Sequence, residues 1–598
     1  MKKWLLLMGL LPWNLALGQE NDPARVAFNC VPASARTTLA VNNIRANLLG
    51  SGPHWGPNAN SNGRGFEVPA GSGLSSMFAG SLWMGGLDQN GSLRVAAQTY
   101  RQSSTLGVGF WPGPLSVDNG STTASNCRRY DSLWRVTAQD IRNHVLNSTQ
   151  PGYQMPASIA NWPGNGEFGF ETKLAPYVDI DANGIYNPAN GDYPKIYGDE
   201  AVFSVYNSFG NVAGTGGLSL RFEVQEMVYA FNRPGPLNNA VFHEYKIINR
   251  SALRIDSFYY GVFIDPDLGN SLDDYVGCDV SRSMAYAYNA DNDDNGATGY
   301  GTQPPAVGVA IFQGAFSDPQ DGRDNNLDGT IDNLPVDCQN QPSTERYAMW
   351  NFLAFNNDPT PTGNPTTDVH VYNYLRGRWK DGSPMVFGGN GYPGSPGAST
   401  TPARYMFPGS SDPNGFGLGG SPSAPVTPPF QWSETVNGTN NANVAGDRRF
   451  VMSMGPLTMA PGSINTFTIG TVWARAQSGG PQASLTELLQ NTSQIKALFD
   501  DCSIFGLNAL SLNDVQKPMF KVYPNPAKNQ VMISGDFEAK PVNVQLYDLQ
   551  GRLVRTFDAA EPEGNALKLD LQGLNAGSYL LKWQTKGFNQ VEKLWINP

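Results

Sequence analysis

Charged residues are scarce in this chain of 598 residues, at 15%, whereas soluble domains usually carry about a quarter. The formal net charge is −11, so the chain lacks the basic surplus that binding to nucleic acid or to an anionic membrane requires. Beyond the first residues, no stretch approaches the run of about 20 apolar residues that a transmembrane helix needs. These absences argue against nucleic-acid partners and against a transmembrane segment.

Local signatures of common catalytic sites are missing too. The four histidines form no HExxH or HxH motif, and no GxSxG, P-loop or GxGxxG motif occurs in the context that it needs. Glycoside hydrolysis requires only two carboxylates in a cleft, which leave no local signature. A secreted hydrolase acting on polysaccharide or protein is therefore the alternative to a non-enzymatic protein.

Cysteines are few, and none lies in a CxxC pair, so zinc or redox motifs of that kind are not expected. The five are Cys30, Cys127, Cys278, Cys338 and Cys502. Because the count is odd, at least one thiol stays free or pairs with another chain. We predict a disulfide between Cys278 and Cys338, which flank one acidic segment.

The start of the chain has the pattern of an export signal. Lys2 and Lys3 precede an apolar run at 4–11, and the small residues Ala16 and Gly18 have the spacing that a signal peptidase reads. We therefore predict a cleaved signal peptide at 1–18. No cysteine lies at the cleavage point, so lipid attachment there is not expected.

Glycine and proline are abundant, at 66 and 44 residues, and 11% of the residues are aromatic. This composition is typical of many short strands joined by long turns. We predict a mainly β, multi-domain β-sandwich with two β-rich regions, at 19–215 and 216–502, and a linker at 503–519. One packing helix is expected at 484–500, where Ser484 and Glu487 form a capping-box pattern. The Gly-, Pro- and Ser-rich stretch 388–429 is expected to be a long surface loop or a loosely ordered insertion.

From residue 520 onward, seven short runs are separated by Gly, Pro, Asn or Glu. Apolar residues alternate with polar ones in two of them, at Val542, Val544 and Leu546 and again at Leu567, Leu569 and Leu571. Period-two alternation in seven short runs predicts an immunoglobulin-like β-sandwich at 520–598.

This segment resembles the type A C-terminal sorting domain of the type IX secretion system. The resemblance is carried by "VYPNP", "LYDLQGRLV", "LDLQGLNAGSYLLKW" and the closing "KLWINP". It implies export by the type IX secretion machinery, with release from the outer cell surface or attachment there to surface lipopolysaccharide. The preceding region resembles the passengers of other large proteins exported in this way, through stretches such as "DIDANGIYNPANGDYP" and "GDRRFVMSMGPLTMAPG". That resemblance implies a surface protein without an assigned activity.

Aspartate-rich turns are the most specific feature of the passenger. A calcium loop needs oxygen ligands at positions one, three and five, a glycine at six and a backbone carbonyl at seven. The stretch "DIDANGIYNPANGD" supplies this pattern; its expected ligands are Asp179, Asp181, Asn183, Ile185, Asn190 and Asp192. Position twelve is Asn190 where an EF-hand has glutamate, so the loop looks more like those of dockerins or thrombospondin repeats.

The spacing recurs twice. A second loop has the expected ligands Asp291, Asp293 and Asn295, and a third has Asp324, Asn326, Asp328 and Asp332. A looser cluster contains Asp265, Asp267, Asp273 and Asp274. Between residues 256 and 340, fifteen aspartates face two arginines, a net −13. Such crowded carboxylates repel one another unless cations neutralise them or water solvates them, because like charges in one site disfavour ionisation.

Taken together, these patterns predict an exported, non-enzymatic protein of the adhesin or structural type, stabilised by calcium. Its ligand, a glycan or a protein, is not specified by the sequence. Asp, Asn and Gly are also the usual residues of ordinary turns, which is the simpler interpretation of any single loop.

Overall fold

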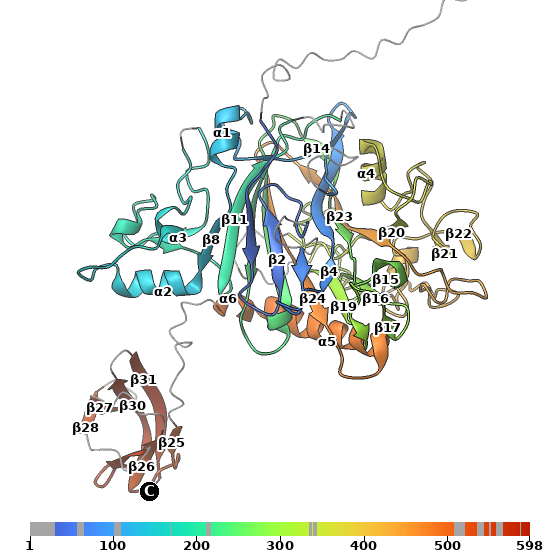
Figure 1. Cartoon of the computed structure of the whole chain (residues 1–598). Helices are drawn as coiled ribbons and strands as arrows, with labels where there is room; N and C mark the ends of the chain where they lie inside the picture. Colours follow the sequence, from blue (N-terminus) through green and yellow to red (C-terminus); the bar gives the residue numbers. More distant parts are fainter. Residues whose placement is uncertain are drawn as a thin grey trace, which may run out of the picture. The chain divides into compact units, whose positions relative to one another are not determined.

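The computed structural model describes residues 30–56, 65–100, 109–167, 169–210, 217–333, 338, 344–507, 521–534, 543–548, 552–557, 566–585 and 588–597. The chain divides into two compact units, one up to Asn508 and one from Ala509. Strands dominate both units, which confirms the mainly β fold (Figure 1). The predicted signal peptide at 1–18 lies outside the described residues.

A nine-stranded antiparallel sheet forms one layer of the larger unit. Its strands are β7 (Trp111–Pro112), β8 (Trp134–Thr137), β11 (Glu200–Asn207), β12 (Phe222–Ala230), β13 (Ala240–Asn249), β15 (Asp274–Asp279), β16 (Met284–Asn289), β19 (Ala306–Gln313) and β24 (Ile464–Ala474). Their order is β15-β16-β19-β24-β13-β12-β11-β7, and β8 also pairs with β11. Every residue of β11 and β12 is buried, so both faces of the sheet are covered there.

A five-stranded sheet packs against it. Its strands are β5 (Ala79–Asp88), β6 (Leu93–Ala96), β14 (Ile255–Asp265), β20 (Asn351–Asn356) and β23 (Arg448–Met459), in the order β20-β23-β14-β5-β6. Aromatic rings join the two layers: the ring centroids of Phe222 and Phe258 are 5.2 Å apart, and those of Tyr260 and Phe467 are 5.0 Å apart. The core of the sandwich therefore lies between these sheets.

The predicted boundary at residue 215 is wrong. β5 pairs with β14, and β11 pairs with β12, so strands from both sides of that boundary complete the same two sheets. The chain also passes between the layers from β13 to β14 and from β23 to β24. One core requires all of these strands, so the two regions fold as one unit.

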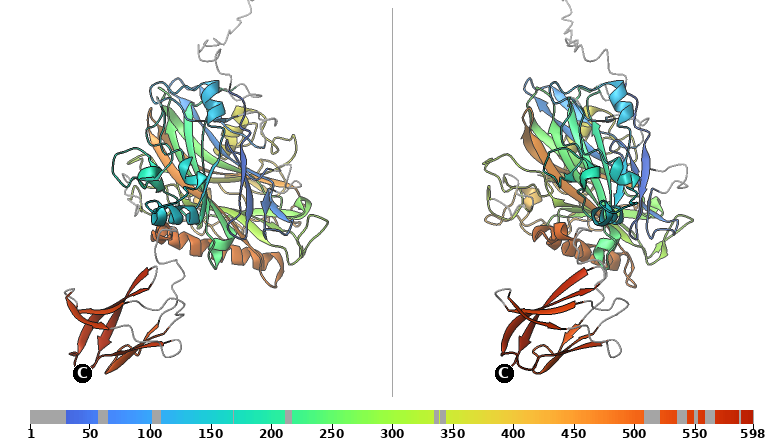
Figure 2. Two further views of the ribbon diagram at one scale, coloured as in Figure 1. Left: turned by 60° about the vertical axis from the view of Figure 1, so that its left-hand side comes forward. Right: turned by 90° about the vertical axis from the view of Figure 1, so that its left-hand side faces the viewer.

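The packing helix exists but begins earlier than predicted. Helix α5 (Gly480–Asp500) places Ser484 inside the helix, where its hydroxyl donates to the carbonyl of Pro304 at 2.7 Å. Ser484 is therefore not an N-cap. Phe499 packs on Phe312 of β19 and Phe242 of β13, with ring centroids 5.0 and 5.6 Å apart. The helix thus packs on one face of the nine-stranded sheet. In Figure 2 it is the orange helix along the lower side of the sandwich.

Smaller elements surround the sandwich. A four-stranded sheet contains β1 (Arg36–Leu39), β2 (Arg45–Leu49), β3 (Phe66–Glu67) and β4 (Ser75–Met77). Two-stranded sheets pair β9 (Tyr177–Val178) with β10 (Tyr193–Pro194), β17 (Asp293–Asp294) with β18 (Gly301–Thr302), and β21 (Val386–Gly388) with β22 (Ala398–Pro402). The short helices are α1 (Ala124–Arg129), α2 (Ala138–Asn147), α3 (Ala157–Ala160), α4 (Asp368–Leu375) and α6 (Ser503–Gly506), with single turns η2 (Pro188–Asn190), η3 (Pro236–Asn239), η4 (Ser271–Asp273) and η5 (Phe416–Leu418).

Two predicted connections turned out to be structured. The stretch 388–429 contributes Tyr405 and Met406 to the core, at 1% and 2% exposure, so it is not simply a surface loop. The start of the expected linker at 503–519 forms α6, where Phe505 packs on Tyr197 with centroids 5.0 Å apart. Residues 508–520 lie outside the described ranges.

The smaller unit has two antiparallel sheets. One contains β25 (Lys521–Tyr523), β26 (Gln530–Ser534) and β29 (Ala566–Asp570), and the other contains β27 (Asn543–Asp548), β28 (Leu553–Phe557), β30 (Gly577–Thr585) and β31 (Phe588–Ile596). All seven predicted strands are present. Val544, Leu546, Leu567 and Leu569 are buried in one core, as their alternation predicted, whereas Val542 lies outside the described residues.

Candidate functional site

The first aspartate loop joins β9 to β10 and gathers three carboxylates. Asp179, Asp181 and Asp192 each place one oxygen within 4.8 Å of the others. Asp179 accepts hydrogen bonds from the backbone N–H groups of Asn183 at 3.1 Å and Gly184 at 2.7 Å. Gly184 has a φ of 81°, a conformation that favours glycine. The glycine therefore permits the turn that brings the first two carboxylates together.

The closing carboxylate of this loop is fully buried. Asp192 is 0% exposed and accepts backbone hydrogen bonds from Ile180 at 2.8 Å and Asn187 at 2.9 Å. Asn190, at position twelve, donates from Nδ2 to Asp181 at 3.0 Å. That hydrogen bond is the main cause that lowers the pKa of Asp181. The loop is thus held in shape by its own backbone and amide groups.

The third aspartate loop repeats this geometry in the connection from β19 to β20. Asp324 accepts hydrogen bonds from the backbone N–H groups of Asp328 at 3.0 Å and Gly329 at 2.9 Å. Its third carboxylate comes from Glu345, which the sequence did not indicate; Asp324, Asp328 and Glu345 place oxygens within 4.8 Å of one another. Glu345 is 2% exposed and accepts from the backbone N–H of Asn325 at 3.0 Å. Burial raises the pKa of Glu345.

Other predicted ligands lie in these two loops outside the carboxylate groups. Asn183 Oδ1 accepts from the backbone N–H of Ile185 at 2.8 Å, and Asn326 Nδ2 donates to Asp328 at 3.0 Å. Asp332 turns to accept a backbone N–H at 3.1 Å, so it does not close the third loop. The position that sequence spacing gave to Asp332 is filled by Glu345.

The second predicted loop does not gather its ligands. Asp291, Asp293 and Asn295 are exposed, and neither aspartate belongs to a group of three His, Cys, Asp or Glu donors among the described residues. Neighbouring residues of a strand point to opposite faces, and Asp293 and Asp294 form β17. Asp294 is the buried one, and it accepts a backbone hydrogen bond from Tyr300 at 2.7 Å. Asp294 therefore serves as a hydrogen-bond acceptor for the backbone inside the fold, and not as a cation ligand.

Two members of the looser cluster lie close to a third carboxylate, which belongs to the residue just before β23. Asp265, Asp267 and Asp447 place oxygens within 4.8 Å of one another. Arg449 lies 3.1 Å from Asp265 and 2.8 Å from Asp447, and the hydroxyl of Tyr100 donates to Asp265 at 2.8 Å. Burial and the charge of Asp267, opposed by Arg449, raise the pKa of Asp265 to about 7. One arginine therefore faces three acids.

The other two members lie apart from that group. Asp274 is 1% exposed and accepts a backbone hydrogen bond from Leu268 at 3.1 Å, whereas Asp273 accepts from Asn270 Nδ2 at 3.1 Å. Burial raises the pKa of both carboxylates. Both act inside the fold as hydrogen-bond acceptors.

A histidine–glutamate cluster in the core also escaped sequence reasoning. Glu226 accepts from His54 Nε2 at 2.7 Å and His243 Nδ1 at 2.9 Å, and Tyr206 donates to its second oxygen at 3.1 Å. Burial alone raises the pKa of Glu226, but its interactions with the two histidines outweigh burial and hold that pKa well below its usual value. Burial lowers the pKa of His243. Since all of these hydrogen bonds lie inside the sandwich, the cluster braces the core.

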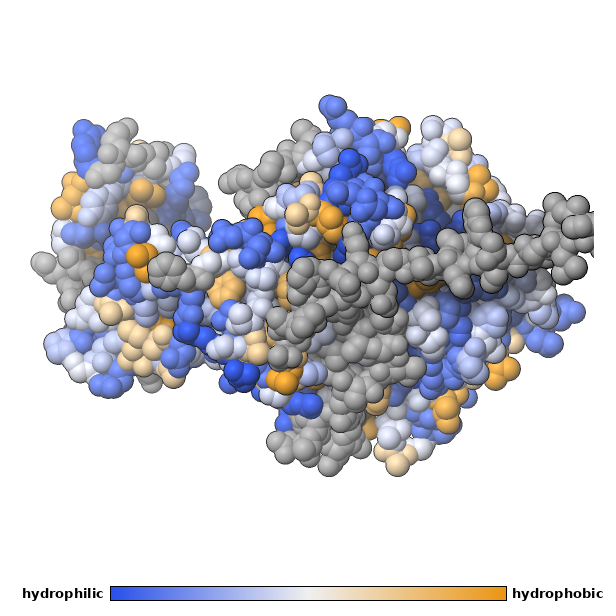
Figure 3. Space-filling view, turned by 90° about the horizontal axis from the view of Figure 1, so that it is seen from above, coloured by the Kyte–Doolittle hydropathy of each residue, from blue (hydrophilic) through white to orange (hydrophobic). Residues whose placement is uncertain are grey.

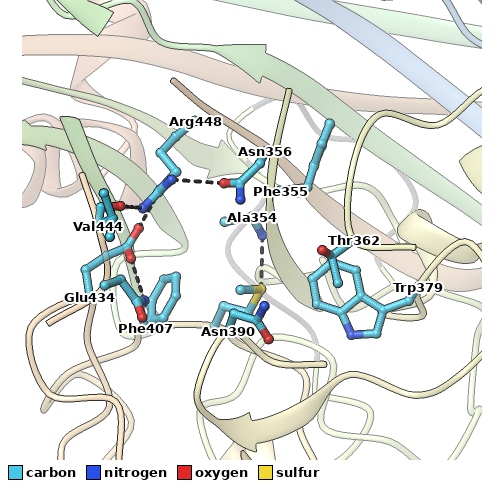
Figure 4. Close-up of a pocket in the computed structure, with 12 residues that line it drawn as sticks. Ala354, Phe355, Asn356, Thr362, Trp379, Asn390, Phe407, Glu434, Val444 and Arg448 are labelled. Atoms are coloured by element: carbon cyan, nitrogen blue, oxygen red, sulfur yellow. Dashed lines mark hydrogen bonds and ion pairs between the residues drawn. The ribbon is translucent and has the colours of Figure 1, made fainter. Parts of the chain in front are cut away.

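A polar pocket of about 230 Å³ opens beside β20. In Figure 4, Glu434 and Arg448 lie on one side, and Thr362 and Trp379 lie on the other. Arg448 donates to Glu434 at 3.0 Å and to Asn356 Oδ1 at 2.9 Å. Glu434 is the only carboxylate among the described residues that line this pocket.

Residues 521–597 match the family model described as the secretion system C-terminal sorting domain. The smaller unit is a type IX sorting domain. The sorting domain directs the chain to secretion at the cell surface, through the type IX secretion machinery. The predicted identity of this segment is thereby confirmed.

No curated protein matches the chain. A solved structure of a polysaccharide lyase has 8% identity and a TM-score of 0.15, and the match covers 62% of this chain and 34% of the lyase. The chain thus spans about a third of that protein, and a similarity this low does not indicate a shared activity.

The larger unit contains disulfides, as is common in exported proteins. Cys30 pairs with Cys127 and Cys338 with Cys502, with Cα atoms 5.7 and 5.4 Å apart. The predicted pair of Cys278 and Cys338 is wrong, because Cys278 is buried inside β15 with a free thiol. Disulfides are typical of exported proteins.

Within the described ranges, no helix combines the length and apolarity needed to cross a bilayer. On the face shown in Figure 3, hydrophobic residues are scattered among hydrophilic ones.

Proposed function

We propose that the larger unit is a non-enzymatic surface protein, of the adhesin or structural type, in which calcium closes two repeated aspartate loops. One observation carries the calcium proposal. The loops at Asp179 and Asp324 lie far apart in the sequence, yet share one pattern of backbone hydrogen bonds, and each recruits a buried third acid. Two ordinary turns have no reason each to gather a buried third carboxylate of their own.

The donor set suits calcium. Each group offers three carboxylates and no nitrogen or sulfur ligand, and calcium is a hard cation that takes six to eight oxygen ligands. Without a cation, each group would bring three negative charges within 4.8 Å, which is costly because like charges repel. Extracellular calcium modules work with dissociation constants of about 10⁻⁴ to 10⁻³ M. Export by the sorting domain supplies the setting for such a site.

The pairing of buried charges supports a non-enzymatic role. Glu434 pairs with Arg448, and Asp265 with Arg449. Glycoside hydrolysis needs two carboxylates in one cleft, and the lining of the polar pocket has only Glu434 among the described residues. Incubating the full-length chain with a panel of polysaccharides and with casein tests this role. Release of reducing ends or peptides would favour the hydrolase alternative.

Attachment to surface lipopolysaccharide is part of the same proposal. It is supported by the sorting domain alone. Cell fractionation of the native producer, with and without its lipopolysaccharide, tests it. The calcium proposal is tested by thermal unfolding of the full-length chain in calcium and in chelator, as developed below.

A further inference from the structure

We infer that the polar pocket beside β20 binds one residue of a neutral sugar. This inference rests on the proposed surface role, since it names the class of ligand that such a protein would hold. The pocket is formed by segments distant in sequence, from β20, the region after α4 and the residues that precede β23. Its volume of about 230 Å³ is smaller than the 300–1,000 Å³ typical of drug-sized ligands, so it suits a single ring.

The charge of the pocket favours a neutral ligand. Glu434 is 1% exposed and Arg448 is 12% exposed at their side chains, and the two form an ion pair of 3.0 Å. Glu434 also accepts from Asn443 Nδ2 at 2.7 Å. Because each charge is already compensated by its partner, an anion would have to compete with Glu434 for the guanidinium. A cation would have to compete with Arg448 in the same way.

The hydrogen-bonding capacity of the pocket is only partly used. Asn356 Oδ1 accepts from Arg448, and Asn390 Oδ1 accepts from the backbone N–H of Tyr392 at 3.1 Å, so both amides are held in a fixed orientation. Their Nδ2 groups make no hydrogen bond to another described residue, and both residues are exposed. The carboxylate of Glu434 keeps a lone pair on each oxygen. Fixed donors beside an acceptor suit hydroxyl groups, which both donate and accept.

Aromatic rings supply the remaining wall. Trp379, Phe355 and Phe407 line the pocket, and Trp379 is fixed by a hydrogen bond from Nε1 to the carbonyl of Gly391 at 2.8 Å. Figure 4 shows Trp379 opposite the pair of Glu434 and Arg448. A ligand with polar edges and an apolar ring face matches both walls. A purely apolar ligand would remove water from the Nδ2 groups of Asn356 and Asn390 without offering them acceptors.

Ligand-observed saturation-transfer NMR on the full-length chain tests this inference. The probes are glucose, galactose, mannose and N-acetylglucosamine, each alone, with glucuronate and galacturonate as anionic probes. We expect saturation of at least one neutral sugar and none of the anions. A double variant, Asn356→Ala with Asn390→Ala, should weaken that binding about ten-fold or more, because it removes two hydrogen bonds. Asn440→Ala, an exposed change in the loop before β23, should leave it unchanged.

Three results would overturn the inference: no neutral sugar bound, a glucuronate or galacturonate signal in place of a sugar signal, or equal sugar binding by the double variant. If the double variant fails to fold, Thr362→Val tests the opposite wall and should also weaken binding. The outcome is separate from the calcium proposal. Sugar binding with a melting temperature unmoved by chelator would refute calcium closure alone, and a calcium-dependent melting temperature without sugar binding would refute only this inference.

Discussion

Removal of calcium should lower the unfolding temperature of the chain, and two substitutions should each abolish about half of that effect. Asp192→Asn removes the closing charge of the first loop, and Glu345→Gln removes that of the third. Both side chains are buried at 2% exposure or less, and each keeps an acceptor for a backbone N–H after substitution. The loops should therefore fold but bind the cation weakly.

The size of the effect follows from mass action. With a dissociation constant of about 10⁻⁴ to 10⁻³ M and calcium at about 10 mM, each site stabilises the folded state by about 1.4–2.7 kcal/mol. Two sites contribute about 3–5 kcal/mol. For a unit that ends at Asn508, the entropy of unfolding is about 1 kcal/mol per kelvin. Differential scanning calorimetry should therefore show a rise of about 3–5 °C between chelator and calcium.

A matched control separates the cation from ordinary loop stability. Asp412 is also buried and accepts two backbone N–H groups, from Phe416 and Gly417, both at 2.8 Å, but it belongs to no group of three candidate donors among the described residues. Asp412→Asn should lower the unfolding temperature equally in calcium and in chelator. The reasoning fails if chelator leaves the parent chain unchanged, or if calcium still stabilises the variant with both loop substitutions to the full extent.

Three further predictions concern other parts of the larger unit. The pKa values of Glu226 and His243 lie below their ordinary 4.5 and 6.5 in the folded chain, so the stability present above about pH 6.5 should fall as acid is added towards pH 4. Glu226→Gln should steepen this fall in denaturant titrations, because Glu226 opposes the burial that lowers the pKa of His243, and should cost about 1–3 kcal/mol at pH 7; a flat parent profile would contradict the prediction. In the presence of chelator, Asp267→Asn should raise the free energy of unfolding by about 1–2 kcal/mol, because burial and the charge of a neighbouring aspartate raise the pKa of Asp267 to about 6. A lower melting temperature would refute this. Peptide mapping of the oxidised chain should show Cys338 joined to Cys502, and Cys502→Ser should cost about 2–5 kcal/mol in denaturant titrations, whereas a different cross-link would disprove the pairing.

Local patterns in the sequence were enough to predict the smaller unit. All seven strands of the sorting domain were visible as short runs bounded by turn residues, and in two of them alternation marked the buried face. The larger unit was harder. Strands such as β11 and β12 are buried along their whole length, so the sequence indicated strands without indicating which sheet they join.

The candidate calcium ligands show the same contrast between residues that are close in sequence and residues that are distant. Asp179, Asp181 and Asp192 lie within one short stretch, so their spacing was enough to bring them together in prediction. Glu345 comes from beyond the third loop, where no local spacing points to it. The same limit explains the wrong disulfide: Cys502 follows α5 and meets Cys338 only through the packing of that helix.

The long connection from β19 to β20 shows why these distant contacts matter. It contains no strand of the two large sheets among its described residues, and connections of this length rarely hold one conformation without extra constraints. The third aspartate loop, its closing Glu345 and the disulfide at Cys338 all lie within it. The first loop likewise lies between β8 and β11, outside the large sheets. Segments that lie outside the hydrophobic core are held by cross-links. The proposed calcium ion would be a cross-link of this kind, formed by carboxylates and not by a pair of cysteines.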